Sequence, residues 1–143
     1  MQDTTLITKI ARAFPVDPRP TRDMILYEGA YRGDEELEEI QEFFADRPWN
    51  SIAPGDVFRF RHALSFFSPQ TFVYFTPAWM TCSLQDEEVV DTAPENLMGI
   101  LAEANPDQWT QEEKCVICEW LVHFSGRSLM EIYAQAMTNF GCD

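Results

Sequence analysis

Four short segments of this chain carry the residues that begin α-helices, and apolar residues at helical spacing follow each of them. Residues 110–113 (Thr-Gln-Glu-Glu) and 128–131 (Ser-Leu-Met-Glu) have the form of a capping box, in which two side chains satisfy each other's backbone N–H groups. Residues 92–95 (Thr-Ala-Pro-Glu) are a weaker example, and Ser68 precedes a proline at a first helical position. The chain is therefore predicted to be all-α, a single irregular helical domain (residues 1–143) of about six to seven helices.

Two further helices are expected in the N-terminal half. Residues 4–14 carry an apolar stripe and should form a helix that stops before Pro15. Gly33 and Asp34 are expected to open a second helix, whose early acidic residues suit the positive end of the helix dipole. The apolar stripe of that helix is Leu37, Ile40, Phe43 and Phe44.

Three segments allow more than one structure. Residues 56–66 alternate weakly in the manner of a strand, but a helix fits them as well and is preferred. Residues 24–31 are a loop or a short strand, which leaves open an α+β alternative with a short two-stranded element at 24–31 and 57–61. Residues 69–85 are one kinked helix or two short helices that meet near Thr76, because Thr76-Pro77 repeats the Ser-Pro start.

The charge of the chain restricts its partners. The formal net charge is −14, and residues 62–143 hold only Lys114 and Arg127 against twelve acidic residues. A field of that sign repels phosphate groups and anionic lipid, so no direct nucleic-acid partner and no membrane partner are predicted. It attracts basic proteins instead. Eleven Phe and four Trp residues make the chain too aromatic for disorder, so this charge must cover a folded core.

The cysteines are expected to be free thiols. No secretory leader and no apolar stretch of about 18 residues can be recognised, which indicates a cytoplasmic, reducing compartment. This applies to all four cysteines: Cys82, Cys115, Cys118 and Cys142. Cys115 and Cys118 form a second apolar strip on their predicted helix, so both are expected in the core. The alternative is a metal- or thiol-dependent protein centred on this pair, with His123 nearby.

No group of residues has the spacing of a catalytic centre. His62 and His123 belong to no nucleophile or zinc pattern and are interpreted as half-buried structural rings. The acidic residues fall mainly in segments 34–46 and 86–91, and both segments are interpreted as solvent-exposed surfaces. No catalytic residue, no metal site and no cofactor is therefore predicted, and the chain is not expected to be an enzyme.

One segment resembles a known family. Trp49 lies in a loop, and the segment 66–78 follows the pattern Phe-Phe-Ser-Pro-x-x-Phe-x-Tyr-x-x-Pro-Ala. This is similar to the central signature of a family of small bacterial cytosolic proteins of unknown function, over about two-thirds of the chain. The resemblance implies a shared core and shared helix boundaries. By type, as a small acidic protein, the chain is also similar to toxin-immunity proteins.

The favoured hypothesis is an acidic binding protein that neutralises a basic protein, in particular an immunity protein that blocks a cognate bacterial toxin such as a nuclease. A non-catalytic structural or regulatory module, acidic only for solubility, is the alternative. The protein is expected to be a monomer or homodimer, with exposed residues in the neighbourhoods of Trp49 and Trp79 as anchors. The predicted partner-binding residues are Glu35, Glu36, Glu38, Glu39, Glu42, Asp46, Asp86, Glu87, Glu88 and Asp91.

Overall fold

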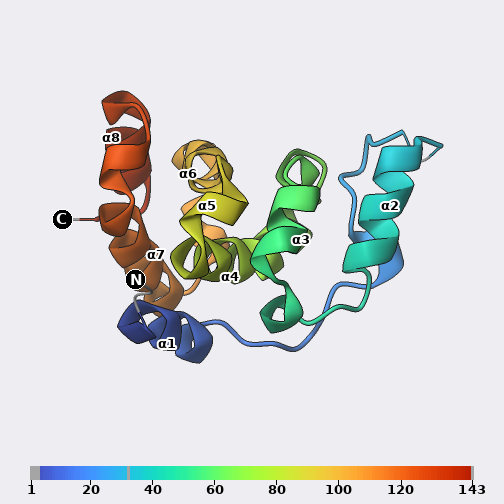
Figure 1. Ribbon diagram of the computed structural model, residues 1–143, viewed down its shortest axis with the longest axis horizontal. Coiled ribbons are helices and arrows are strands. Elements are labelled where there is room, and N and C mark those ends of the chain that lie inside the picture. The colour runs from blue at the N-terminus through green and yellow to red at the C-terminus, as the bar shows by residue number, and fades with distance from the viewer. Residues whose placement is uncertain (1–3, 32, 143) are drawn as a thin grey trace.

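The chain folds as an all-α domain, seen in a computed structural model that describes residues 4–31 and 33–142 (Figure 1). This confirms the predicted fold class. Eight α-helices lie in those residues, one or two more than expected, and five 3₁₀ turns connect them. The helices are α1 Thr4–Ala13, α2 Glu35–Phe44, α3 Pro54–Arg59, α4 Pro69–Gln85, α5 Glu87–Val90, α6 Ala93–Glu103, α7 Gln111–His123 and α8 Met130–Asn139.

Helix α4 is the centre of the structure. It packs against α1, α3, α5 and α6, so its sequence is apolar on every side rather than along one stripe. The helix runs without a break through Pro77, which settles the choice between one helix and two. Buried hydroxyl groups bond back to the helix on either side of this proline, from Thr76 to the Phe72 carbonyl and from Ser83 to the Trp79 carbonyl.

Helix α2 lies at one end of the molecule and α8 at the other (Figure 1). Phe44 attaches α2 to the rest through edge contacts with Phe60, Phe67 and Phe75, whose ring centroids lie 5.0–5.4 Å away. Such aromatic pairs add about 0.5–1.5 kcal/mol each to the free energy of burial. At the opposite end, α8 packs on α6, and its Asn139 amide donates to the carbonyls of Leu101 and Ala104.

The two-stranded alternative is wrong. Residues 57–59 belong to helix α3, and the chain turns at Phe60 before the short 3₁₀ turn η3 (Ala63–Ser65). The preferred single helix over 56–66 is therefore correct only for its first part. Residues 24–31 form a loop that makes one isolated antiparallel bridge, from Leu26 to Phe67. One bridge is no sheet, and no strand occurs in the described part of the chain.

The capping signals differ in how well they predicted helix starts. Ser68 and Thr110 each accept a backbone N–H group from the helix that follows, as expected, and Asp34, at the predicted start of α2, accepts two. Thr92 stands at the N-cap of α6, but its side chain makes no capping bond. The prediction at Ser128 is wrong, because α8 begins two residues later with Leu129 at its N-cap.

The cysteine predictions need correction. Cys118 and Cys142 form a disulfide that ties the end of the described chain to α7, so these two are not free thiols. Cys82 is buried as a free thiol, whereas Cys115 is exposed. The supposed second apolar strip of α7 is not in the core either, since Val122 on the same face is also exposed. Within the described residues, no helix has both the length and the apolar character needed to span a membrane.

Candidate functional site

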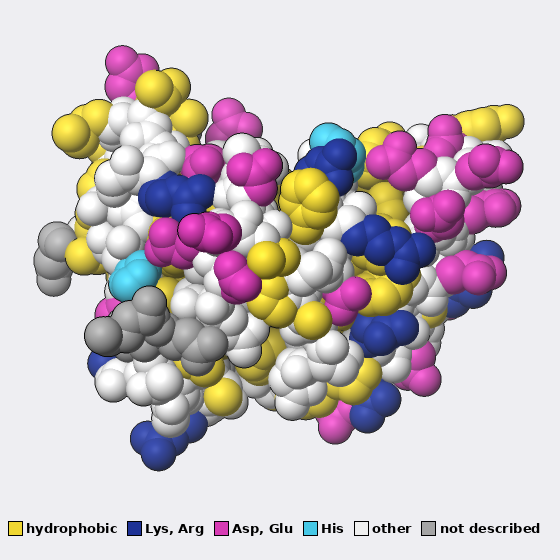
Figure 2. Space-filling model, viewed as in Figure 1, with side chains coloured by type: hydrophobic (Ala, Val, Ile, Leu, Met, Phe, Trp, Pro, Cys, Tyr) yellow, Lys and Arg dark blue, Asp and Glu magenta, His cyan; other side chains and the backbone are white. Residues whose placement is uncertain are grey.

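The outer face of helix α2 is an acidic surface. Its inner face, with Leu37, Ile40 and Phe44, is buried, and that burial turns the remaining positions toward solvent. Figure 2 shows acidic side chains gathered over this helix at the right-hand end of the molecule. Every acidic residue predicted here is exposed. We call this set the α2 face: Glu35, Glu36, Glu38, Glu39, Glu42 and Asp46.

Few cations neutralise the α2 face. Among the described residues its one ion pair joins Glu42 Oε1 to Arg22 Nη1 at 3.6 Å, and both side chains are more than half exposed. Asp46 is fixed through its backbone, whose N–H donates to the Pro20 carbonyl and whose carbonyl accepts from Arg19. The carboxylates of the first two turns lie beside the positive end of the helix dipole. Most of their negative field is directed at solvent.

The second predicted acidic group is exposed but already partly neutralised. Asp86, Glu87, Glu88 and Asp91 lie on or beside the short helix α5. The Arg127 guanidinium approaches Glu87 at 3.6 Å and Glu95 at 2.9 Å, and it donates to the Asp91 carbonyl at 2.7 Å. Asp86 uses a carboxylate oxygen to accept the Val89 N–H. This group therefore helps to hold α5, α6 and the α7–α8 turn together, in addition to contributing negative charge to the surface.

The two acidic groups do not meet. Helix α3 lies between α2 and α5 (Figure 1). The sequence placed the ten acidic residues in two segments, 34–46 and 86–91, and in the structure these segments form two separate groups. Of the two, the α2 face has the less compensated charge.

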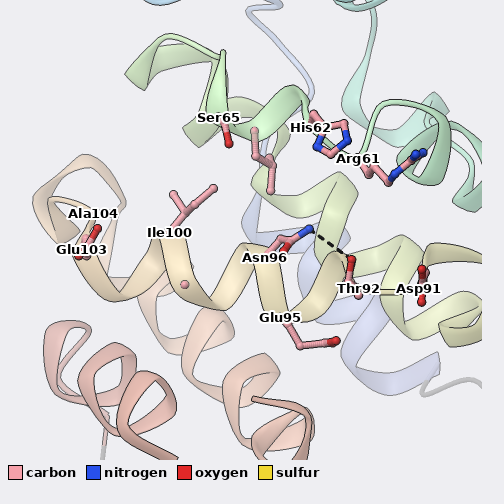
Figure 3. A pocket seen from close by; sticks show the side chains of 12 residues that line it. Arg61, His62, Ser65, Asp91, Thr92, Glu95, Asn96, Ile100, Glu103 and Ala104 are labelled. Carbon is pink, nitrogen blue, oxygen red and sulfur yellow. Dashed lines mark hydrogen bonds between the residues drawn. The ribbon is translucent and has the colours of Figure 1, made fainter. Parts of the chain in front are cut away.

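A groove of about 800 Å³ opens between η3 and α6. Arg61 and His62 stand on one wall, and Figure 3 shows Asn96 and Ile100 on the other. Glu95 points away from His62 (Figure 3), and its carboxylate forms an ion pair with Arg127. The Ser65 backbone N–H donates to the His62 carbonyl at 3.2 Å, but among the described residues no hydrogen bond joins the His62 ring to the Ser65 hydroxyl or to an acid, so the ring and this hydroxyl are not paired as base and nucleophile.

Both histidines were expected to be half-buried, and both are exposed. His123 packs against the edge of the Phe124 ring, with 4.7 Å between ring centroids. Residues 61–66 turn instead of continuing α3, which places His62 on the rim of the groove. Over the described residues no three His, Cys, Asp or Glu side chains come together in a way that could hold a metal ion.

Trp49 and Trp79 are themselves buried, so only exposed residues near them could act as the expected anchors. Sequence reasoning missed Tyr31, which at 75% exposure is more open to solvent than the other exposed aromatic residues, Tyr27 and Phe58. Its carbonyl accepts the Asp34 N–H, so this ring stands at the N-terminal end of the α2 face. The feature of the sequence that could have identified Tyr31 is its position shortly before the N-cap of α2 and outside every apolar stripe.

A model of a protein family of unknown function (DUF6714) matches residues 2–123. The chain belongs to this family. That confirms the expected membership in a family of unknown function. The DUF6714 match ends with the last residue of α7, so it includes both acidic groups, and α8 lies beyond it. No curated protein and no solved structure matches the chain.

Proposed function

We propose that this protein is an acidic binding protein that covers a basic surface of a partner protein, with the α2 face as its contact surface. The observation that carries the proposal is the run of exposed carboxylates along α2, of which only Glu42 has an ion-pair partner among the described residues. A charge of this kind raises the rate at which a basic partner is encountered in the correct orientation.

Affinity needs more than charge, because exposed ion pairs contribute only about 0–1 kcal/mol each. Tyr31 supplies the complementary feature, a large exposed ring at the end of the acidic helix. Aromatic residues are frequent among the few interface residues that dominate binding energy. In this proposal the carboxylates set the association rate, and Tyr31 slows dissociation.

The specific form of the proposal is an immunity protein that blocks a cognate basic toxin. A toxin that binds RNA or DNA has a basic active site, and an acidic helix matches such a site in charge. For an immunity protein of this kind, we expect an adjacent gene to encode the partner. Co-expression of the two should protect cells that the partner alone would kill.

A charge-reversal experiment tests the contact surface. One variant carries Glu35→Lys, Glu36→Lys and Glu39→Lys on α2. The control carries Glu28→Lys, Glu112→Lys and Glu131→Lys, which are exposed acids outside both groups. Both variants change the net charge equally. Association with the adjacent gene product is then followed by stopped-flow fluorescence at several salt concentrations.

The α2 variant should associate at least roughly tenfold more slowly than the control at low salt, with the difference shrinking as salt screens the charges. Tyr31→Ala should instead raise the dissociation rate. Equal losses in both charge variants would contradict the assignment of the contact surface, and absence of any complex would contradict the function.

A further inference from the structure

A second cavity, of about 450 Å³, lies on a different part of the molecule. The proline-rich loop that follows α1 forms one wall, and the first turns of α4 form another. Its lining is mainly apolar, with Phe14 directly after α1, Met24 from the following segment and Val73 from α4. Cavities of this size with few polar groups are the usual sites for small molecules.

Hydrogen bonds fix the loop in place over the cavity. The Tyr74 hydroxyl donates to the Val16 carbonyl at 2.6 Å and accepts the Trp49 N–H at 3.1 Å. The Trp49 indole N–H donates to the Pro15 carbonyl at 3.2 Å. Since Trp49 is buried, this network is anchored in the core. The cavity is therefore preformed, and a ligand need not pay the entropy of ordering the loop.

One buried carboxylate contributes to the lining. Glu113 is only 8% exposed, and it lines the cavity from the first turn of α7. Its Oε1 accepts the Thr110 N–H at 2.7 Å, as the capping box requires. Among the described residues Oε2 has no hydrogen-bond donor, and Glu113 has no ion pair. A carboxylate in a mainly apolar cavity wall, with one oxygen free of protein donors, favours a cationic partner.

The other charged groups of the lining are compensated. Arg19 Nε lies 3.3 Å from Asp17 Oδ1, and the Arg19 guanidinium also donates to the Asp46 carbonyl. Glu113 is thus the one lining charge without a counter-ion in the described structure. The side-chain amide of Gln70, also in the lining, offers a second oxygen acceptor.

We propose that this cavity binds a small organic cation, a primary ammonium group on an apolar body. The ammonium donates to Glu113 Oε2, and the apolar body packs between Phe14, Met24 and Val73. Three ammonium protons suit the carboxylate and the Gln70 amide oxygen together, whereas a neutral apolar molecule would leave Glu113 unsatisfied. This inference does not depend on the proposed function, because it concerns another surface.

The test uses 2-phenylethylammonium as the probe and 2-phenylethanol as its neutral analogue. Each is titrated into the full-length protein at about 0.15 M salt, which screens exposed charges beyond roughly 8 Å. Binding is followed by the amide resonances of Val73, Tyr74 and Glu113. The ammonium ion should bind about tenfold more tightly than the alcohol, the usual effect of a hydrogen bond to a charged group.

Matched variants separate the carboxylate from the general negative charge of the protein. Glu113→Gln keeps an oxygen for the capping bond but removes the charge, so it should abolish the preference for the ammonium ion. Glu112→Gln makes the same charge change at an exposed neighbour and should leave the preference intact. Val73→Trp should block both probes by filling the cavity, and circular dichroism confirms that each variant is folded.

Three results would overturn the proposal. They are equal affinity for the two probes, an equal loss of preference in Glu112→Gln and Glu113→Gln, or the absence of saturable binding by the folded wild-type protein. A cavity that took either probe equally would be an apolar pocket without charge selectivity.

Discussion

At the scale of single residues, the two free cysteines lie in different environments. Cys82 is 1% exposed, and its Sγ donates to the Ile52 carbonyl. Desolvation by burial, with a smaller contribution from Asp56, raises the pKa of Cys82 to about 12. Cys115 is exposed on α7 and accepts a weak hydrogen bond from the Gln111 amide. Because the thiolate is the reactive form, these two thiols should differ sharply in reactivity.

We therefore expect Ellman's reagent at pH 8 to titrate one thiol per native chain and two in denaturant. Cys115→Ser should abolish the native reaction, and Cys82→Ala should leave it unchanged. Rapid reaction of two thiols in the native wild-type protein would contradict either the burial of Cys82 or the disulfide between the other two cysteines.

At the scale of helices, the caps offer the clearest comparison. The Asp34 carboxylate accepts the N–H groups of Glu36 at 2.9 Å and Leu37 at 3.3 Å. Ser128 resembled an equally good cap in the sequence, but its side chain makes no capping bond to α8. Two residues that are both favoured at N-caps therefore have different energetic roles in this chain.

Asp34→Ala should lower the free energy of unfolding by about 1 kcal/mol, the usual cost of losing an N-cap. Ser128→Ala should change it by no more than a few tenths. Urea denaturation followed by far-UV circular dichroism measures both. Equal effects would show that local sequence, and not the observed capping geometry, decides the stability of these two helices.

Local chemistry accounts for most of the helices that were predicted correctly. Asp34, Ser68 and Thr110 act within four residues, so their sequence patterns were sufficient. The errors lie where long-range packing decides. The turn after α3 follows Phe60 into the aromatic cluster around Phe44, a contact that no local pattern contains. The burial of Trp49 likewise depends on Tyr74 and Pro15.

The candidate site, like the fold, could be predicted from the sequence only where local spacing decides it. Amphipathic spacing correctly indicated that the acids of α2 face solvent, because burying Leu37 and Ile40 leaves them no other direction. Sequence spacing could not indicate that Arg127 approaches Glu87 and Glu95. Nor could it place Glu113 in the wall of a cavity, since that wall combines segments about a hundred residues apart.

At the scale of the whole molecule, the disulfide between Cys118 and Cys142 closes a loop around α8. The two residues are 24 positions apart. Restricting a loop of this length in the unfolded state stabilises a protein by about 3 kcal/mol in the chain-entropy model. The stability of α8 against α6 should therefore depend on the oxidation state.

Cys142→Ser should lower the melting temperature of the protein measured without reductant. Dithiothreitol should lower that of the wild-type protein to a similar value and leave the variant unchanged. A wild-type melting temperature that does not respond to dithiothreitol would contradict a stabilising disulfide. Mass spectrometry after alkylation verifies the oxidation state in each sample.

Helix α1 has a consequence for the synthesis of the chain. Its buried residues Leu6 and Ile10 face α4 and α7, and its Lys9 reaches Glu119, 110 positions later. On the ribosome, at roughly 5–20 residues per second, α7 is made on the order of ten seconds after α1. For that interval the nascent apolar face of α1 has no complete binding site. It is then an exposed target for the chaperones that attend translation.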